Sequence, residues 1–260
     1  MTTPDDSPAV LTHRPLERDD AARVTEAETA AFRALVASLD DVDWQRDTAS
    51  AGWRVREVVA HVGGQYEEFA RVGTLLRRLW VARRRYRDRI VLDGHNQVQL
   101  DDTADRSNAQ VAAQLDVFAA AGIRAVRRMP APVRRAPVRL FFPEPPLPEK
   151  GMRYVFDILA ARDTWMHRLE VARATDREFV VGDHDHEIVA QVVRDLDRQW
   201  PGPAVTLALD GPAGGTWQVG SGPSAGIVRA DAVEMMLHLS GRAGLDLPPD
   251  SPFGNARVVF

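Results

Sequence analysis

Seven prolines fall within residues 130–150 and divide the helical part of this sequence into unequal pieces. Proline has no backbone N–H to donate, and its ring clashes with the preceding helical turn, so a run of this kind excludes a regular helix. We therefore expect residues 130–150 to form a long connection between two helices. The spacing of apolar residues on either side of this connection then predicts the fold class.

Four helices are predicted around this connection, because apolar side chains recur at helical spacing with charged residues between them. They are expected over residues 16–39, 55–89, 107–128 and 151–174. Ser107 is a favourable N-cap for the third helix. Gly63 and Gly64 mark a place in the second helix where another element can pack closely. Four helices joined by loops of unequal length indicate a helical bundle.

The pattern changes after about residue 183, where shorter elements replace the long helices. A helix is expected near residues 186–200, followed by strands at 204–210 and 216–220, a short helix ended by Gly241, and a last strand at 256–260. The sequence therefore predicts a mainly α protein with a small α+β domain at its end. The expected organisation is a disordered N-terminus (1–15), a four-helix bundle (16–183) and the small α+β domain (184–260).

Composition limits the classes of function. The net charge is −4 and the isoelectric point is about 6.0, so neither nucleic acid nor an anionic membrane is an expected partner. The N-terminus lacks the basic start and apolar run of a signal peptide, and no stretch is apolar enough to span a bilayer, which favours a cytoplasmic protein. The chain has no cysteine, so any thiol chemistry requires a thiol from outside.

Residues 77–89 contain seven arginines, with Trp80 and Tyr86 among them. Basic residues interleaved with aromatic ones can indicate nucleic-acid binding. The alternative is a solvated helix end whose aromatic side chains pack inward, and the negative net charge favours this interpretation. A third possibility is that one of these arginines binds an anionic substrate. We expect the protein to be a monomer or a homodimer.

The strongest chemical signal is the pair Asp163 and His167 on the fourth predicted helix. At a spacing of four residues, their side chains meet on one face, beside apolar residues. A carboxylate in such a place is costly unless it is paired or bound to a metal. His61, inside a run of valines, is the best candidate for a third ligand. Two imidazoles and a carboxylate suit zinc, and also iron, nickel or manganese, whereas a helical ion pair is the alternative interpretation.

The other histidines carry weaker signals. His184 and His186 lie in an acidic stretch, residues 182–187, that is interpreted as a polar linker between the domains, with adventitious metal binding as the alternative. His238 follows two methionines and a leucine, which is typical of a core histidine.

Two segments resemble a known family. "GWRVREVVAH", which ends at His61, and "DTWMH", which holds Asp163 and His167, resemble the metal-binding segments of the mycothiol-dependent maleylpyruvate isomerase family, part of the DinB-like bundles. Asp163 stands where this family usually has glutamate. "LDGHNQVQ" resembles the family's asparagine-containing segment, at Asn96. The end of the chain is similar to the family's sterol-carrier-like C-terminal domain.

This resemblance implies a divalent metal, most often zinc, on His61, Asp163 and His167, with mycothiol as cosubstrate. A bound cation favours thiolate over thiol, and the thiolate attacks an electrophilic carbon. The thiol then leaves, in an isomerase, or stays attached, in a transferase. Arg242 matches an arginine of the family that reaches the active site and could bind a substrate carboxylate. A helix-end arginine that faces water is the alternative.

Three functions follow as hypotheses. The first is a mycothiol-dependent metalloenzyme that isomerises or S-conjugates a small electrophile. The second is a metal-binding sensor or partner-binding protein without catalysis, in which Asp163 has changed the properties of the site. The third is a carrier of small ligands that works through the C-terminal domain.

Overall fold

The computed structural model describes residues 10–12, 14–143, 147–247, 251 and 253–260, which form two compact units. The helical unit contains residues 16–180, with Phe260. The C-terminal unit contains residues 181–259 and the segment up to residue 15. The disordered N-terminus expected over residues 1–15 lies partly outside the described residues. Within the described part, the backbone N–H of Leu11 donates to Thr216 of the same unit.

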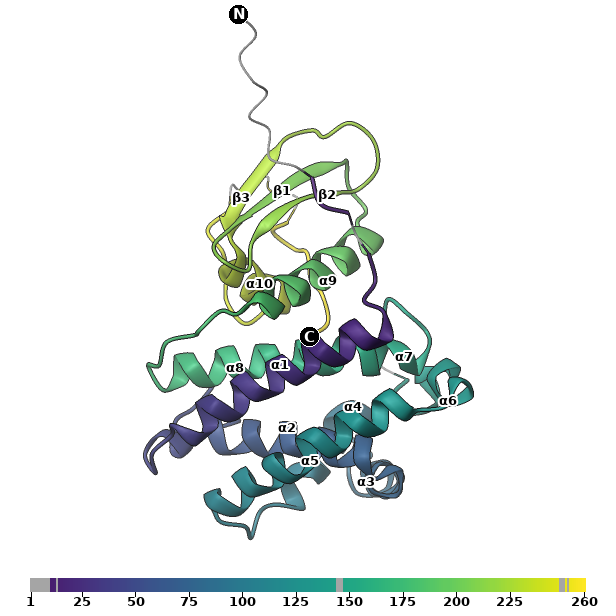
Figure 1. The fold of residues 1–260 in the computed structure, drawn as a ribbon, viewed down its shortest axis with the longest axis vertical. Coiled ribbons are helices and arrows are strands. Elements are labelled where there is room, and N and C mark those ends of the chain that lie inside the picture. Colours follow the sequence, from purple (N-terminus) through teal and green to yellow (C-terminus); the bar gives the residue numbers. More distant parts are fainter. Residues whose placement is uncertain (1–9, 13, 144–146, 248–250, 252) are drawn as a thin grey trace, which may run out of the picture. The chain divides into compact units, whose positions relative to one another are not determined.

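Four long helices build the helical unit. They are α1 (Arg18–Ala37), α2 (Val55–Ala70), α5 (Asn108–Arg128) and α8 (Ala160–Ala174). Helix α1 packs against α8 and α5, and α2 packs along α5 and also contacts α8 (Figure 1). Ser107 caps α5, because its hydroxyl accepts a hydrogen bond from the N–H of Gln110 at 3.3 Å. The predicted mainly α fold with a four-helix bundle is confirmed.

The predicted single helix over residues 55–89 is wrong. Helix α2 ends at Ala70, Arg71 leaves the helical region (φ −136°, ψ 84°), and two further helices follow, α3 (Val72–Arg85) and α4 (Val91–Asp101). Helices α3 and α4 pack against each other. Apolar spacing continues through the break without a proline or a strong stop signal, so periodicity alone did not reveal it.

The proline-rich connection is largely irregular, as predicted, but it contains short helical turns. These are α6 (Ala131–Arg135) and a 3₁₀ turn (Val138–Leu140), and a similar turn (Asp43–Gln45) precedes α2. Helix α6 tolerates proline because its prolines lie at the N-terminal end, where the missing N–H has no partner in any case. The fourth predicted helix begins with α7 (Met152–Tyr154) and a π turn (Val155–Leu159) before α8.

Two glycines allow α2 and α5 to approach closely. A Cβ atom at Gly122 of α5 would lie 2.6 Å from the carbonyl oxygen of Tyr66 on α2. A Cβ atom at Gly63 would lie 3.4 Å from the backbone N of Leu115. The predicted close packing at Gly63 and Gly64 is therefore present. It brings the valine face of α2 into a core that also contains Phe32.

We expect Gly122→Ala to destabilise the helical unit by about 1–3 kcal/mol, because backbone atoms in a packed helix pair cannot move aside cheaply. Gly73→Ala is the matched control, since a Cβ atom there meets nothing within 4 Å. That control should leave the free energy of unfolding unchanged or raise it by up to about 1 kcal/mol. Urea unfolding of the two variants and the wild type measures both effects, and equal stabilities would contradict the close contact.

The C-terminal unit combines two helices with a small mixed sheet. Its elements are α9 (Asp183–Gln199), β1 (Val205–Asp210), β2 (Gly215–Val219), β3 (Ile227–Asp231) and α10 (Ala232–Ser240). The sheet order is β2-β1-β3, with β1 antiparallel to β2 and parallel to β3 (Figure 1). Helix α9 packs on β2. The α+β fold predicted for this part of the chain is confirmed.

Two details of this unit differ from the sequence prediction. Residues 256–260 form no strand, and the third strand is instead residues 227–231, an edge strand with little burial. Its sequence therefore lacks the apolar alternation that identifies a half-buried strand. Helix α10 ends at Gly241 as predicted, in the left-handed conformation with φ 78°.

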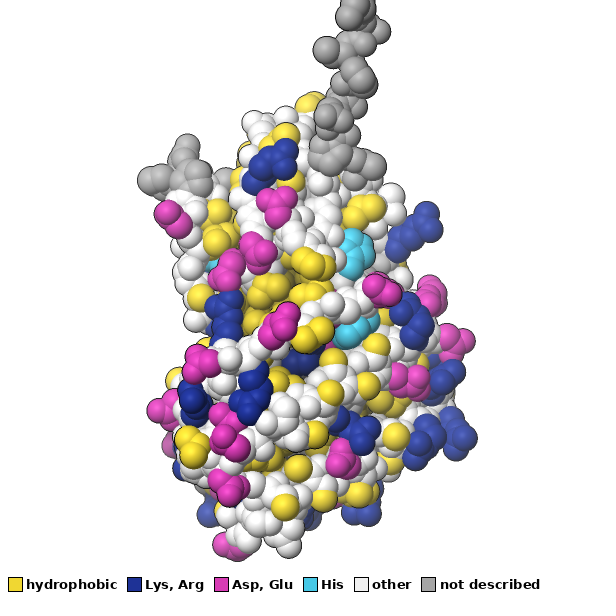
Figure 2. Space-filling view, turned by 60° about the vertical axis from the view of Figure 1, so that its left-hand side comes forward, with side chains coloured by type: hydrophobic (Ala, Val, Ile, Leu, Met, Phe, Trp, Pro, Cys, Tyr) yellow, Lys and Arg dark blue, Asp and Glu magenta, His cyan; other side chains and the backbone are white. Residues whose placement is uncertain are grey.

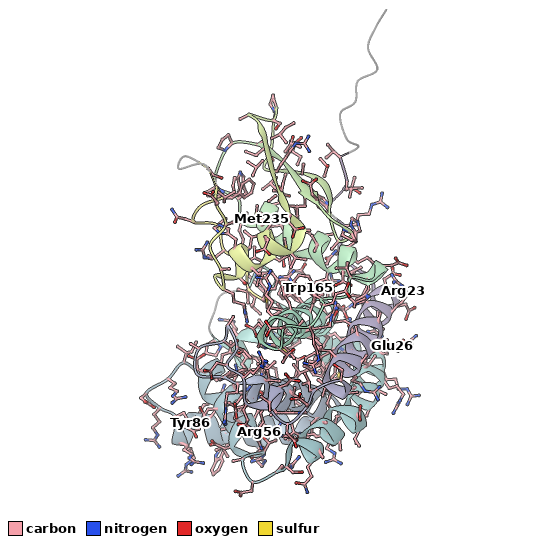
Figure 3. The ribbon with its side chains drawn as sticks, turned by 90° about the vertical axis from the view of Figure 1, so that its left-hand side faces the viewer. Arg23, Glu26, Arg56, Tyr86, Trp165 and Met235 are labelled. Carbon is pink, nitrogen blue, oxygen red and sulfur yellow. The ribbon has the colours of Figure 1, made fainter. Side chains whose placement is uncertain are left out.

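The surface carries both signs of charge. Acidic and basic side chains are interspersed on the face shown in Figure 2, and Arg23 and Glu26 lie on the exposed side of α1 (Figure 3). Trp80 is 58% exposed, so the predicted inward packing is wrong for this residue, whereas Arg78 is buried. Among the described helices, none combines the length and the apolar character needed to cross a membrane.

Candidate metal centre

Helices α2 and α8 bring His61, Asp163 and His167 together. The Nε2 atom of His61 lies 3.5 Å from Oδ2 of Asp163, and the Nε2 atom of His167 lies 3.5 Å from Oδ1 of the same carboxylate. One ligand atom from each residue can be chosen so that all three lie within 4.8 Å of one another. The three residues that the sequence singled out therefore share one location, with donor atoms spaced as a single cation requires.

Trp53 covers one side of this cluster. Its ring centroid lies 5.1 Å from that of His61 and 6.0 Å from that of His167. The two imidazole side chains are 8% and 5% exposed, whereas the Asp163 side chain is 19% exposed. The Asp163 side chain is therefore the most exposed of the three, and the two imidazoles are buried beneath the indole.

Both imidazoles are held by a second partner through Nδ1. Nδ1 of His61 lies 2.7 Å from Oε1 of Gln99, and Nδ1 of His167 lies 2.7 Å from Oε2 of Glu170. Glu170 also accepts a hydrogen bond from the Ser50 hydroxyl at 2.9 Å. When Nδ1 donates to an acceptor, the lone pair of a neutral imidazole is on Nε2, the atom that faces Asp163. Metal-binding histidines in proteins are commonly held in this way.

The electrostatics of the cluster follow from its burial and its charges. Burial disfavours the charged form of His167, but the carboxylates of Asp163 and Glu170 outweigh it and raise the pKa of His167 to about 9. Burial also disfavours the Asp163 carboxylate, yet His167 and His61 hold its pKa well below the ordinary value. The carboxylate of Asp163 therefore stays ionised, and a cation that binds at His167 must displace a proton, so metal binding competes with protonation of that ring.

Gln65 is a member of this site that the sequence prediction missed. It lies one turn after His61 on α2, and its Nε2 donates to Oδ2 of Asp163 at 3.0 Å. Its Oε1 atom is buried and has no hydrogen-bond partner among the described residues. The sequence signal that could have identified Gln65 is its spacing of four residues from His61, which places both side chains on one face of α2. The aspartate, one methylene shorter than glutamate, is thus reached by an amide from the opposite helix.

The donor set fits a divalent metal. Two imidazole nitrogens and one carboxylate oxygen are the ligands of many catalytic zinc sites, which keep a further position for water or substrate. Both imidazoles have an acceptor on the other nitrogen, and the carboxylate has its own donor in Gln65. The same donors also suit other first-row metals, so the geometry alone does not identify the ion.

The remaining predicted residues lie in the C-terminal unit. Arg242 comes directly after α10, and its backbone N–H donates to Leu237 O at 3.0 Å; its catalytic role stays a prediction. Nε2 of His238 lies 2.8 Å from the carbonyl oxygen of Phe253, and the residue is buried, which confirms it as a core histidine.

The interpretation of residues 182–187 as a linker is wrong. They contain the first turn of α9, where the Asp185 carboxylate accepts a hydrogen bond from the N–H of Gly182 at 2.8 Å. The acidic residues of this stretch suit that position, because the N-terminus of a helix favours negative charge. Nδ1 of His186 lies 2.7 Å from the carbonyl oxygen of Gly214.

Comparison with known proteins gives a family match for the helical part of the chain and a similar fold among solved structures. Residues 25–172 match the family described as the mycothiol maleylpyruvate isomerase N-terminal domain. The fold is similar to a crystal structure of the mycothiol-dependent maleylpyruvate isomerase, with a TM-score of 0.58, 13% identity, and coverage of 88% of this chain and 90% of that one. A histidine-to-alanine mutant of that isomerase matches with the same TM-score and coverage, at 12% identity. No curated protein matches the sequence.

Proposed function

The chain belongs to the mycothiol maleylpyruvate isomerase N-terminal domain family, and from this premise we propose that it is a metal-dependent enzyme with mycothiol as cosubstrate. The reaction is the isomerisation or the S-conjugation of a small electrophilic substrate. The observation that carries the proposal is the convergence of His61, Asp163 and His167, whose donor atoms lie within 4.8 Å of one another.

The residues of the site have separate tasks in this proposal. His61, Asp163 and His167 hold the divalent metal, which we propose to be zinc. A bound cation supplies a positive charge that lowers the pKa of an incoming thiol, from about 8.5 for a free thiol, and so favours the nucleophilic thiolate. Trp53 keeps water from one side of the imidazoles. Glu170 holds the ring of His167 in place through Nδ1.

The absence of cysteine supports an external thiol, since the chain has no thiol of its own. The proposed partners are accordingly a small-molecule thiol and a small electrophile, encountered in the cytoplasm. Nucleic acid and membrane are not proposed as partners, in keeping with the net charge of −4.

Two measurements on the full chain test the proposal. The first is the zinc content of the purified protein, with the affinity measured by competition with a coloured chelator. The second is incubation of the zinc-loaded protein with mycothiol and a panel of electrophiles that includes maleylpyruvate, followed by mass spectrometry and chromatography of the products. Thiol adducts or isomers that form no faster with the protein than without it would refute the proposed catalysis for those substrates.

Tight metal binding without any acceleration would support the second hypothesis, a sensor or partner-binding protein. Asp163 is the observation behind this alternative, because the shorter acid places its carboxylate one methylene further back than the family's usual glutamate. Asp163→Glu distinguishes the two. A site that gained activity through this change would show that the aspartate is what limits catalysis.

We expect Arg242→Ala to lower kcat/KM about 10- to 100-fold for substrates with a carboxylate, if this arginine binds that group by two charge-assisted hydrogen bonds. For neutral electrophiles, the same substitution should lower kcat/KM much less. Steady-state kinetics with a matched acid and amide substrate measure the difference. Equal losses for the two substrates would show that Arg242 does not recognise the carboxylate.

A further inference from the structure

A buried series of hydrogen bonds leads from His61 to a charged cluster that lies behind it. The Oε1 atom of Gln99, on α4, lies 2.7 Å from Nδ1 of His61, and Nε2 of Gln99 donates to Oε1 of Glu68 at 2.9 Å. The same Oε1 atom of Glu68 lies 3.0 Å from Nε2 of His95 and accepts from Nη1 of Arg78 at 2.9 Å. The four residues behind His61 are no more than 5% exposed.

The carboxylate of Glu68 determines which way the side-chain amide of Gln99 faces. An amide can face its neighbours in two ways, since its oxygen accepts and its nitrogen donates. An ionised carboxylate only accepts, so the NH₂ group of Gln99 must face Glu68. The oxygen of Gln99 is then turned toward His61, where it accepts the proton on Nδ1. The Nε2 lone pair of His61 is consequently the one that faces Asp163.

The surroundings of Glu68 keep it ionised. Burial raises the pKa of the Glu68 carboxyl, but the close imidazole of His95, followed by Arg78 and Gln99, outweighs burial and lowers it below the ordinary value. Arg78 is itself tied down, because it donates to Glu67 and Asp102 as well as to Glu68. The carboxylate is therefore a fixed acceptor.

We propose that Glu68, acting through Gln99, selects the tautomer of His61 that presents Nε2 to the metal. Both are positioning residues, since neither side chain contacts the proposed ion. The inference rests on the proposed function, because it assumes that a cation binds between His61, Asp163 and His167. It adds to that function two residues outside the ligand set, Gln99 and Glu68, on which the metal affinity depends.

Gly64 provides the space that Gln99 needs. A Cβ atom at Gly64 would lie 3.3 Å from both Cγ and Cδ of Gln99, tighter than an ordinary contact. Gly64→Ala would therefore push the amide without removing any hydrogen-bonding group. Gly64→Ala therefore tests whether the position of the Gln99 amide matters for zinc binding. A substitution of Gln99 itself tests whether the amide is needed at all.

The central comparison is Glu68→Gln against Glu67→Gln. The two acids are neighbours on α2, each accepts from Arg78 at 2.9 Å, and each change removes one negative charge without changing the shape. Only Glu68 contacts Gln99; Glu67 accepts instead from Gln114 at 3.0 Å. Any loss of zinc affinity that follows from weaker contacts with Arg78 is expected in both variants. A difference in zinc affinity between them therefore reports the contact between Glu68 and Gln99.

We expect Glu68→Gln, Gln99→Leu and Gly64→Ala to weaken zinc binding about 10- to 100-fold, the usual cost of disturbing the partner of a metal-binding histidine. Glu67→Gln should change the dissociation constant by less than about threefold. Chelator competition with zinc alone measures all of them, and thermal unfolding of the metal-free proteins confirms that each variant is folded.

A second measurement reports the nitrogen itself. In the protein loaded with ¹¹³Cd, a ring bound through Nε2 shows coupling from the metal to both ring carbon-bound protons, whereas one bound through Nδ1 shows coupling to Hε1 alone. The wild type and Glu67→Gln should show His61 bound through Nε2, and Glu68→Gln and Gln99→Leu should show a mixture or broadened signals.

Equal zinc affinities and equal couplings in Glu68→Gln and Glu67→Gln would overturn this inference while leaving the metal site intact. Failure of the wild type to bind zinc or cadmium would instead overturn the proposed function, and the inference with it. The two failures are therefore distinguishable in one set of samples.

Discussion

His167→Ala should reduce zinc affinity by more than about 100-fold, because loss of a direct ligand exceeds the usual cost of losing a ligand's partner. In the proposed site His167 supplies one of two nitrogen donors, and its loss would leave His61 and Asp163 as a two-ligand set. Thiol transfer should fall to the uncatalysed rate in the same variant. Chelator competition and product analysis measure the two effects.

His186→Ala is the matched control for that change. Its Nδ1 contacts the carbonyl oxygen of Gly214 in the C-terminal unit, and it is not part of the candidate centre. The control should retain the zinc affinity of the wild type. Full zinc occupancy in His167→Ala, or an equal loss in the two variants, would contradict the assignment of His167 as a ligand.

Arg78→Met should destabilise the folded protein by about 3–5 kcal/mol, because it leaves buried carboxylates without their cation. The Arg78 side chain is 2% exposed and donates to Glu67, Glu68 and Asp102 at 2.8 to 2.9 Å. Urea unfolding at neutral pH measures the loss. The effect belongs among the largest for a single residue, because one side chain serves three acids.

The neighbouring arginine gives the control for this prediction. Arg77 also donates to Asp102, but its side chain is 50% exposed. Ion pairs at the surface contribute only about 0–1 kcal/mol, so Arg77→Met should have little effect. A similar loss of stability in the two variants would show that burial of the Arg78 cluster is not what matters.

The cost of Arg78→Met should also depend on pH. Burial raises the pKa values of Glu68 and Asp102, but their partners, Arg78 among them, outweigh burial and lower both. Groups with lowered pKa values stabilise the fold above the ordinary carboxyl range of about 4, and this stability is lost as the pH falls through the folded values. The difference in the free energy of unfolding between Arg78→Met and the wild type should therefore become smaller below about pH 4. Urea unfolding at neutral and acidic pH tests this.

The sequence singled out the three residues of the candidate centre because their signals are local. Asp163 and His167 lie one turn apart, and His61 ends a segment typical of one family. The residues behind them gave a weaker signal, because Gln99 ends the segment that resembles the family around Asn96, but nothing in its spacing placed it beside His61. Glu170 follows His167 by three residues, but Gln99 comes from α4, and only the break at Arg71 allows α3 and α4 to return beside α2.

The arginine-rich segment shows the same limit. Seven similar arginines between residues 77 and 89 look equivalent in the sequence, yet Arg78 is buried among acids while Arg83, Arg84 and Arg85 are exposed. The difference arises from contacts between helices that are distant in sequence. Helical periodicity reports which residues share a face, and it does not report what the face meets.

The π turn at residues 155–159 has a consequence for comparing this chain with its relatives. A π turn corresponds to one residue inserted into a helix, so the residues before and after it differ by about 100° in rotation about the axis. Asp157, inside the turn, pairs with Arg134; Asp163, beyond it, meets His61 across the bundle. An alignment with a relative whose helix lacks this turn therefore needs a one-residue gap here, because without it the side chains on one side of the turn, Asp163 among them, would be matched one position away.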